Sequence, residues 1–113
     1  MGIEMALYII SGNYTQSALK GMLARPSDRE AAARTLIESA GGALQSFHLT
    51  TGDSDFTMTV RSDNLPRTLS ALMVAGAAGA IANPRTVQAF TSAEFLAMQK
   101  QAGDFAQAYQ APT

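Results

Sequence analysis

Residues 41–61 alternate between apolar and polar side chains on both sides of a turn, and this pattern constrains the fold more than any other stretch. Residues 52–55, with the sequence Gly-Asp-Ser-Asp, are turn formers because they tolerate tight backbone angles or hydrogen bond to their own main chain. We predict a β-hairpin with a two-residue loop at positions 53–54, in which Leu49 faces Met58.

This register divides the hairpin into two faces. The apolar face carries Phe47, Leu49, Phe56, Met58 and Val60. The polar face carries Ser46, His48, Thr50, Thr57, Thr59 and Arg61. A shift of one residue would mix the two sets, because side chains alternate along a strand. We therefore expect one face in the core and any function on the polar face.

The first element is predicted to be a central strand over residues 5–11, because its apolar run is continuous and such strands are buried on both faces. Gly12 and Asn13 end this strand in the prediction, and Thr15 caps the helix that follows. Pro26 interrupts that helix. The chain is thus expected to begin with a strand and a broken helix.

The second part of the broken helix is predicted over residues 28–40. A capping box of Ser27 with Glu30 starts it in this interpretation, and the pair Gly41-Gly42 stops it. The hairpin then follows.

After the hairpin, Asp63 and Asn64 predict the cap of another helix, which ends at Asn83 and Pro84. Its expected buried stripe is Leu65, Leu69, Leu72, Met73, Gly76 and Ala80. Residues 85–90 are predicted as the last strand.

A capping box of Thr91 with Glu94 predicts a terminal helix that continues to about Tyr109. Its apolar stripe is Phe95, Met98, Ala102, Phe105 and Tyr109. A stripe of this width needs a surface to cover. Residues 110–113 are expected to be a frayed tail.

The predicted order is strand, broken helix, strand, strand, helix, strand, helix. This is the ferredoxin-like split β-α-β arrangement of the α+β class, with a four-stranded antiparallel sheet and an added C-terminal helix. The 113 residues suffice for one domain over 1–113, with its core within 5–109.

Composition excludes several classes of function. Nucleic-acid binding is not expected, because only 15% of residues are charged, the net charge is -1 and no basic tract occurs. The absence of cysteine excludes disulfides and thiolate metal sites, and a single histidine makes a transition-metal site improbable. The low charge favours an oligomer.

Two features of the sequence bear on location. Residues 71–82 form the most apolar window, which is shorter than the ~18 residues that span a bilayer. Residues 1–4 lack the basic residues of a signal peptide. We expect a cytoplasmic protein with no membrane contact.

Several segments together resemble the GYD-domain family. They are Tyr8–Thr15, Arg29–Arg34, Gly41-Gly42, the turn at residues 52–55 and the pair Thr91/Glu94. The resemblance runs from about Tyr8 to the C-terminal helix. The motif that names the family has tyrosine where this chain has Ser54, whereas Gly52 and Asp55 match it.

This resemblance implies a dimeric α/β-barrel relative of the ferredoxin-like fold, in which two sheets face each other around a cavity. The family has no established activity. Related dimeric barrels include small monooxygenases, haem-degrading enzymes and stress-response proteins, so the fold by itself selects no reaction.

His48 is the sharpest candidate for a functional residue, because it is the only histidine and lies on the predicted polar face near Thr57, Thr59 and Arg61. A neutral imidazole can accept or relay a proton. Arg61 can anchor a carboxylate through two hydrogen bonds. The alternative is a histidine that hydrogen bonds across the sheet or at a subunit contact.

Tyr8 and Asp55 complete the candidate ligand-binding set. The Tyr8 phenol can donate to a ligand oxygen, although a core position also explains it. Asp55 matches the family motif, although turn chemistry alone explains an aspartate there.

The sequence therefore predicts a homo-oligomer that binds a small organic ligand on the polar face of the sheet. Two alternatives stay open: a module that serves assembly without a ligand, and a cofactor-free enzyme similar to the barrel monooxygenases. No catalytic residue is assigned, and no cofactor is predicted because no flavin, haem or dinucleotide pattern occurs.

Overall fold

The computed structural model describes residues 5–113, so the prediction made for residues 1–4 lies outside the described chain. The elements, in chain order, are β1 (Ala6–Tyr14), α1 (Gln16–Ala24), α2 (Arg29–Ser39), β2 (Ala43–Leu49), β3 (Phe56–Ser62), α3 (Leu65–Ala77), β4 (Ile81–Ala89), α4 (Ser92–Phe105) and the short 3-10 helix η1 (Ala106–Ala108).

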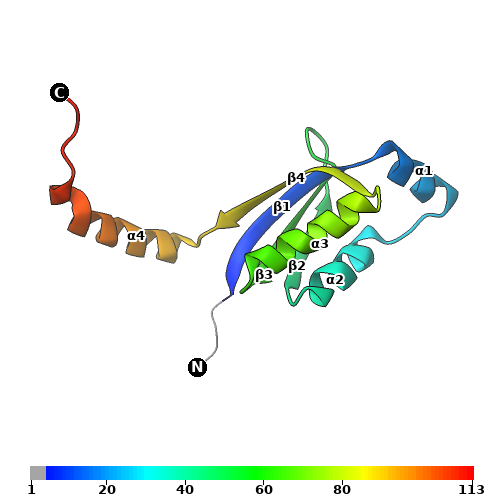
Figure 1. The fold of residues 1–113 in the computed structure, drawn as a ribbon, viewed down its shortest axis with the longest axis horizontal. Helices are drawn as coiled ribbons and strands as arrows, with labels where there is room; N and C mark the ends of the chain where they lie inside the picture. Colours follow the sequence, from blue (N-terminus) through cyan, green and yellow to red (C-terminus); the bar gives the residue numbers. More distant parts are fainter. Residues whose placement is uncertain (1–4) are drawn as a thin grey trace.

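The strands form one antiparallel sheet in the order β2-β3-β1-β4. Helices α2 and α3 lie side by side on one face of this sheet (Figure 1). This architecture confirms the predicted ferredoxin-like α+β fold, including the central place of β1.

The core lies between the sheet and these two helices. Ile10 of β1 and Val60 of β3 are fully buried at its centre, and Ile37 of α2 and Leu72 of α3 pack onto them. Burial alternates strictly along β3, where every second residue from Phe56 to Ser62 is buried. One face of the hairpin therefore supplies the core, as predicted.

The predicted hairpin register is wrong by two residues. Leu49 pairs with Phe56 rather than with Met58, and residues 50–55 form a loop longer than expected. Both faces keep their side chains, because a shift by an even number of residues preserves alternation. The loop is longer because its end is bound to β1: the Asp55 amide donates to the Gly12 carbonyl at 2.8 Å.

β1 does not end at Gly12 and Asn13, as predicted, but continues to Tyr14. A Cβ on residue 12 would stand 3.0 Å from the ring of Phe56, so glycine lets the strand pass this ring. The sequence prediction interpreted this glycine as a chain break, whereas the structure uses it for close packing.

β4 begins at Ile81, four residues before the predicted start, and includes Asn83 and Pro84. The register with β1 shifts at this point, and Asn83 has a φ of 53°. A bulge on an edge strand accommodates a proline, because that position needs no ladder hydrogen bond.

The start of α2 also differs from the prediction. Asp28, not Ser27, is the N-cap, and its carboxylate accepts from the Ala31 amide at 3.1 Å. The hydroxyl of Ser27 accepts a hydrogen bond from Arg29 instead. The predicted caps of the other helices, Thr15, Asn64 and Thr91 with Glu94, are confirmed.

The buried stripe of α3 is rotated from the predicted one. Thr68, Ala71 and Leu72 are buried. Leu69, Met73 and Gly76 are exposed instead. The Thr68 hydroxyl donates to Ser62 Oγ at 2.9 Å, so the polar residue that faces the sheet has a buried hydrogen-bond partner.

Two helices stand apart from this body. Neither α1 nor α4 contains a buried residue, and α4 extends away from the sheet (Figure 1). Along residues 5–113, no helix has the length and apolarity needed to cross a membrane.

Candidate functional site

The sheet face opposite α2 and α3 is uncovered in the part of the chain that the structure describes, and its two halves differ in chemistry. On the β1 and β4 half, Ile9 is 38% exposed and its partner Val87 is 56% exposed, and the next pair on the same face is Ser11 with the exposed Arg85. The β2 and β3 half carries hydroxyls, and Ser46 Oγ lies 2.7 Å from Thr59 Oγ1. The prediction that β1 is buried on both faces is therefore wrong for this chain alone.

Four predicted site residues lie on this uncovered face: His48, Thr57, Thr59 and Arg61. His48 is exposed and pairs with Thr57. Arg61 stands four residues further along β3, roughly 13 Å away, and its Nη1 donates to the Met5 carbonyl at 3.2 Å. The face thus brings His48 close to the threonines but not to the arginine.

The other two predicted residues lie elsewhere. Tyr8 is buried in the core on the helix-covered face. Asp55 lies in the hairpin loop, where its Oδ2 accepts from the Tyr14 amide at 2.9 Å and from Asn13 Nδ2 at 3.3 Å. The main-chain carbonyl of Ser54 accepts a hydrogen bond from the Thr50 hydroxyl. Residue 54 therefore contributes to this turn through its main chain.

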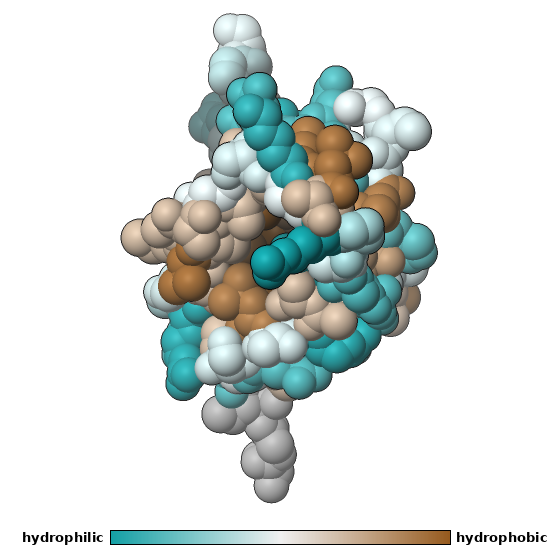
Figure 2. Space-filling model, turned by 90° about the vertical axis from the view of Figure 1, so that its right-hand side faces the viewer, coloured by the Kyte–Doolittle hydropathy of each residue, from teal (hydrophilic) through white to brown (hydrophobic). Residues whose placement is uncertain are grey.

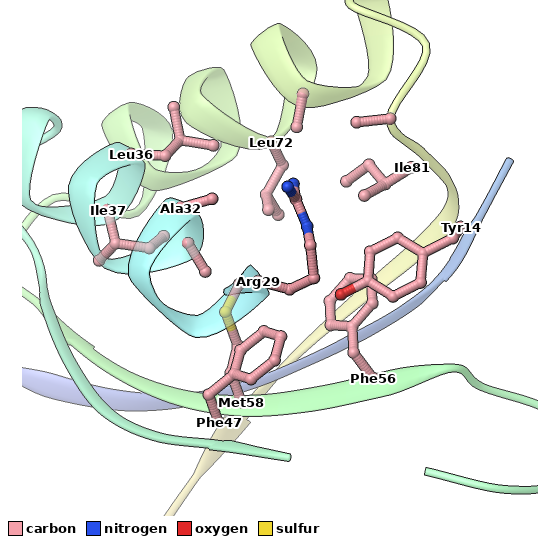
Figure 3. A pocket seen from close by; sticks show the side chains of 13 residues that line it. Tyr14, Arg29, Ala32, Leu36, Ile37, Phe47, Phe56, Met58, Leu72 and Ile81 are labelled. Carbon is pink, nitrogen blue, oxygen red and sulfur yellow. The ribbon is translucent and has the colours of Figure 1, made fainter. Parts of the chain in front are cut away.

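A second candidate site lies on the helix-covered side of the sheet, at the end nearest α1. It is a cavity of about 80 Å³ between α2, α3 and the sheet. Its walls and floor are apolar and include Leu36, Phe47, Phe56, Met58, Leu72 and Ile81 (Figure 3). Hydrophobic side chains gather around a hollow at this end of the molecule (Figure 2).

Tyr14 and Arg29 bring the main polar groups into this cavity. The Tyr14 ring packs on Phe56, with 5.3 Å between ring centroids, and its hydroxyl points toward the Arg29 side chain (Figure 3). Nη1 of Arg29 donates to Ser27 Oγ at 3.1 Å. Its Nε is buried and has no hydrogen-bond partner among the described residues.

The pKa of Tyr14 is raised above its ordinary value of 10.0. Burial of the phenol is the main cause, and the nearby Arg29 guanidinium opposes the shift. The hydroxyl is therefore protonated at neutral pH and available as a hydrogen-bond donor.

Sequence reasoning missed this cavity. Tyr14 has the same even spacing as Tyr8 and Ile10, which indicates that it shares their face. That signal was hidden because Gly12 was interpreted as the end of the strand. Arg29 carries no such signal, since its position depends on where α2 packs.

A metal centre is not indicated in residues 5–113, because histidine and acidic side chains do not gather there in groups of three or more that could hold an ion.

Comparison with known proteins identifies the domain. The GYD domain model matches residues 8–98. The crystal structure of MtbAldR resembles this fold with a TM-score of 0.50 and 17% sequence identity, over 77% of this chain and 52% of that one. At this identity the likeness shows the fold alone, and this chain spans about half the length of that protein. No curated protein matches the chain.

Proposed function

Because the chain belongs to the GYD-domain family, we propose that it is a homo-oligomeric protein that buries its uncovered sheet face against a second copy. In this proposal a small organic ligand binds in the space between the two sheets. A cytoplasmic location belongs to the same proposal and rests on the sequence alone.

The observation that carries the proposal is the exposure of apolar side chains on the central strand β1 and its neighbour β4. Ile9 and Val87 are paired neighbours on the uncovered face, and Leu7 lies next to Ile9 on that face along β1. Burying such a surface is favourable at about 25 cal/mol per Å². A second copy is the simplest occupant. In a two-fold interface the same surface of each partner is buried, so each copy covers the apolar side chains of the other.

The ligand part of the proposal rests on the hydroxyl-rich half. Thr57 and Thr59 present hydroxyls on this face, and His48 lies opposite Thr57. These groups can both donate and accept hydrogen bonds. Two apposed copies would enclose these groups and exclude bulk water. Hydrogen bonds to a ligand are stronger in such an enclosed site than in water.

An assembly module without a ligand is the second candidate, and α4 favours it. This helix contains no buried residue, and Phe95 and Phe105 are 58% and 69% exposed. A helix with such a stripe is stabilised mainly by packing on a partner.

Native mass spectrometry of the purified protein tests both parts. We expect an oligomer, and a mass beyond the sum of its chains would report a retained ligand. The variant Val87→Glu should weaken association at least tenfold, because it places a charge beside Ile9 on the surface that the proposal buries. Gln88→Glu is the matched control, since Gln88 is exposed and lies on the opposite side of the same strand.

A wild-type protein that is monomeric at micromolar concentration would contradict the proposal. So would equal association of the two variants. An oligomer without extra mass, into which no small molecule binds, would select the assembly module.

A further inference from the structure

We propose that the cavity beneath α2 and α3 is a second binding site, on the opposite side of the sheet from the proposed interface, and that it takes a small apolar monocarboxylate held by Arg29 and Tyr14.

The hydrogen bonds of Arg29 carry this inference. Its Nη1 is occupied by Ser27 Oγ, whereas its Nε is buried without an acceptor. A buried donor that lacks a partner is unfavourable, so the site is incomplete as it stands. Nε shares one edge of the planar guanidinium with Nη2, and this edge matches the two oxygens of a carboxylate.

The other residues that line the cavity determine the charge and the apolar character of the expected ligand. The cavity is walled by aliphatic and aromatic side chains, and among the described residues that line it, Arg29 is the charged one. One guanidinium compensates one negative charge, whereas a phosphate or dicarboxylate would leave a second charge against an apolar wall. A ligand with one carboxylate and an apolar body satisfies both halves of the site.

Tyr14 provides the second polar contact. Its ring packs on Phe56, which in turn stacks on Phe47 with 6.1 Å between centroids. This packing fixes the ring, and the protonated hydroxyl can donate to a carboxylate oxygen. The cavity volume of about 80 Å³ exceeds the roughly 15 Å³ that one water needs, so a short branched or aromatic acid is the expected size.

Isothermal titration calorimetry of the full chain with benzoate and with 3-methylbutanoate tests the proposal. We expect binding of at least one of them, and weaker or no binding of the matched neutral amide. Arg29→Gln should weaken carboxylate binding roughly ten- to hundredfold, because it removes a charged hydrogen bond. Arg67→Gln is the control, since it removes the same charge at an exposed position on α3.

A variant that fills the cavity separates binding from folding. Ala75 lies on α3 and lines the cavity, so Ala75→Leu should abolish binding while the melting temperature is kept or raised. Val87→Glu should still bind the acid, because residue 87 lies on the other face of the sheet. Failure of the dimer proposal therefore leaves this test intact.

Three results would overturn the inference. They are no binding of either acid with a Kd below about 10 mM, equal binding of acid and amide, and unchanged binding by Arg29→Gln. If a side chain of a second copy fills the cavity, neither acid binds, and the inference fails in this way. Tyr14 is then less accessible in the oligomer than in the monomer.

Discussion

At the scale of single residues, Asp53 and Asp55 flank the same serine but serve the fold differently. Asp55 uses its carboxylate to accept hydrogen bonds from Asn13 and from the Tyr14 amide. Asp53 is exposed and contributes only its main-chain carbonyl to Asn13. Of these two aspartates, it is therefore Asp55 whose side chain binds the loop to β1.

Asp55→Ala should therefore lower the free energy of unfolding by about 1–3 kcal/mol, because it removes the side-chain acceptor of the Tyr14 amide and one of the two acceptors of Asn13 Nδ2. Asp53→Ala should change it by less than about 0.5 kcal/mol. Urea unfolding of both variants checks this prediction. Equal losses in the two variants would contradict the role given to Asp55.

The raised pKa of Tyr14 predicts that the stability of the folded protein depends on pH. Its pKa is raised above 10.0 in the folded protein, so the folded state holds the phenol proton more tightly than the unfolded state. The resulting stabilisation is complete below about pH 10 and is lost as the pH rises through the folded-state pKa. As the pH rises above about 10, wild type should therefore lose stability relative to Tyr14→Phe.

Thermal unfolding of the two proteins across this range measures the difference. Parallel curves would show that the environment of Tyr14 does not favour its protonated form.

At the scale of elements, the start of α4 is defined by a local capping box, whereas the helix has no buried residue. Thr91 Oγ1 accepts from the Glu94 amide at 3.1 Å, and the Glu94 carboxylate accepts from the Thr91 amide at 2.7 Å. The hydrogen bond that the carboxylate accepts from the Thr91 amide is the main cause that holds the pKa of Glu94 below its ordinary value of 4.5, and the Thr91 side chain lowers this pKa further. The cap defines where α4 starts, but nothing within residues 5–113 buries its apolar stripe.

Phe105→Asp should consequently weaken self-association at least tenfold while leaving the stability of the monomer nearly unchanged. The matched control is Ala97→Asp, which introduces the same charge on α4 away from the stripe of Phe95, Met98 and Phe105. Analytical ultracentrifugation distinguishes them. If both variants associate like wild type, α4 is not part of the assembly surface.

At the scale of the whole molecule, one sheet separates two surfaces of different chemistry. On one side, α2 and α3 cover the core and leave an apolar cavity with Arg29 at its edge. On the other side, the strands remain open, with hydroxyls beside exposed Ile9 and Val87. Because side chains of alternating residues point to opposite faces, a change on one surface need not disturb the other. Assembly and the proposed carboxylate site can therefore be tested independently.

The sequence by itself determined the order of the elements, most of their caps and the division of the hairpin into two faces. These features depend on residues that lie within a few positions of one another, such as Thr91 with Glu94. The faces also tolerate the error in the register, since a shift of two residues keeps every side chain on its side. His48, Thr57, Thr59 and Arg61 lie on the predicted face for this reason.

Only the tertiary structure decided the features that depend on contacts between distant segments. Gly12 extends β1 because the ring of Phe56 packs against it, and the hairpin loop is long because Asp55 is bound to Asn13 and Tyr14. The cavity arises in the same way, since Arg29 reaches it only when α2 packs on the sheet beside Tyr14. Local patterns carry no information about such pairs, because which residues meet is fixed by how the whole chain packs.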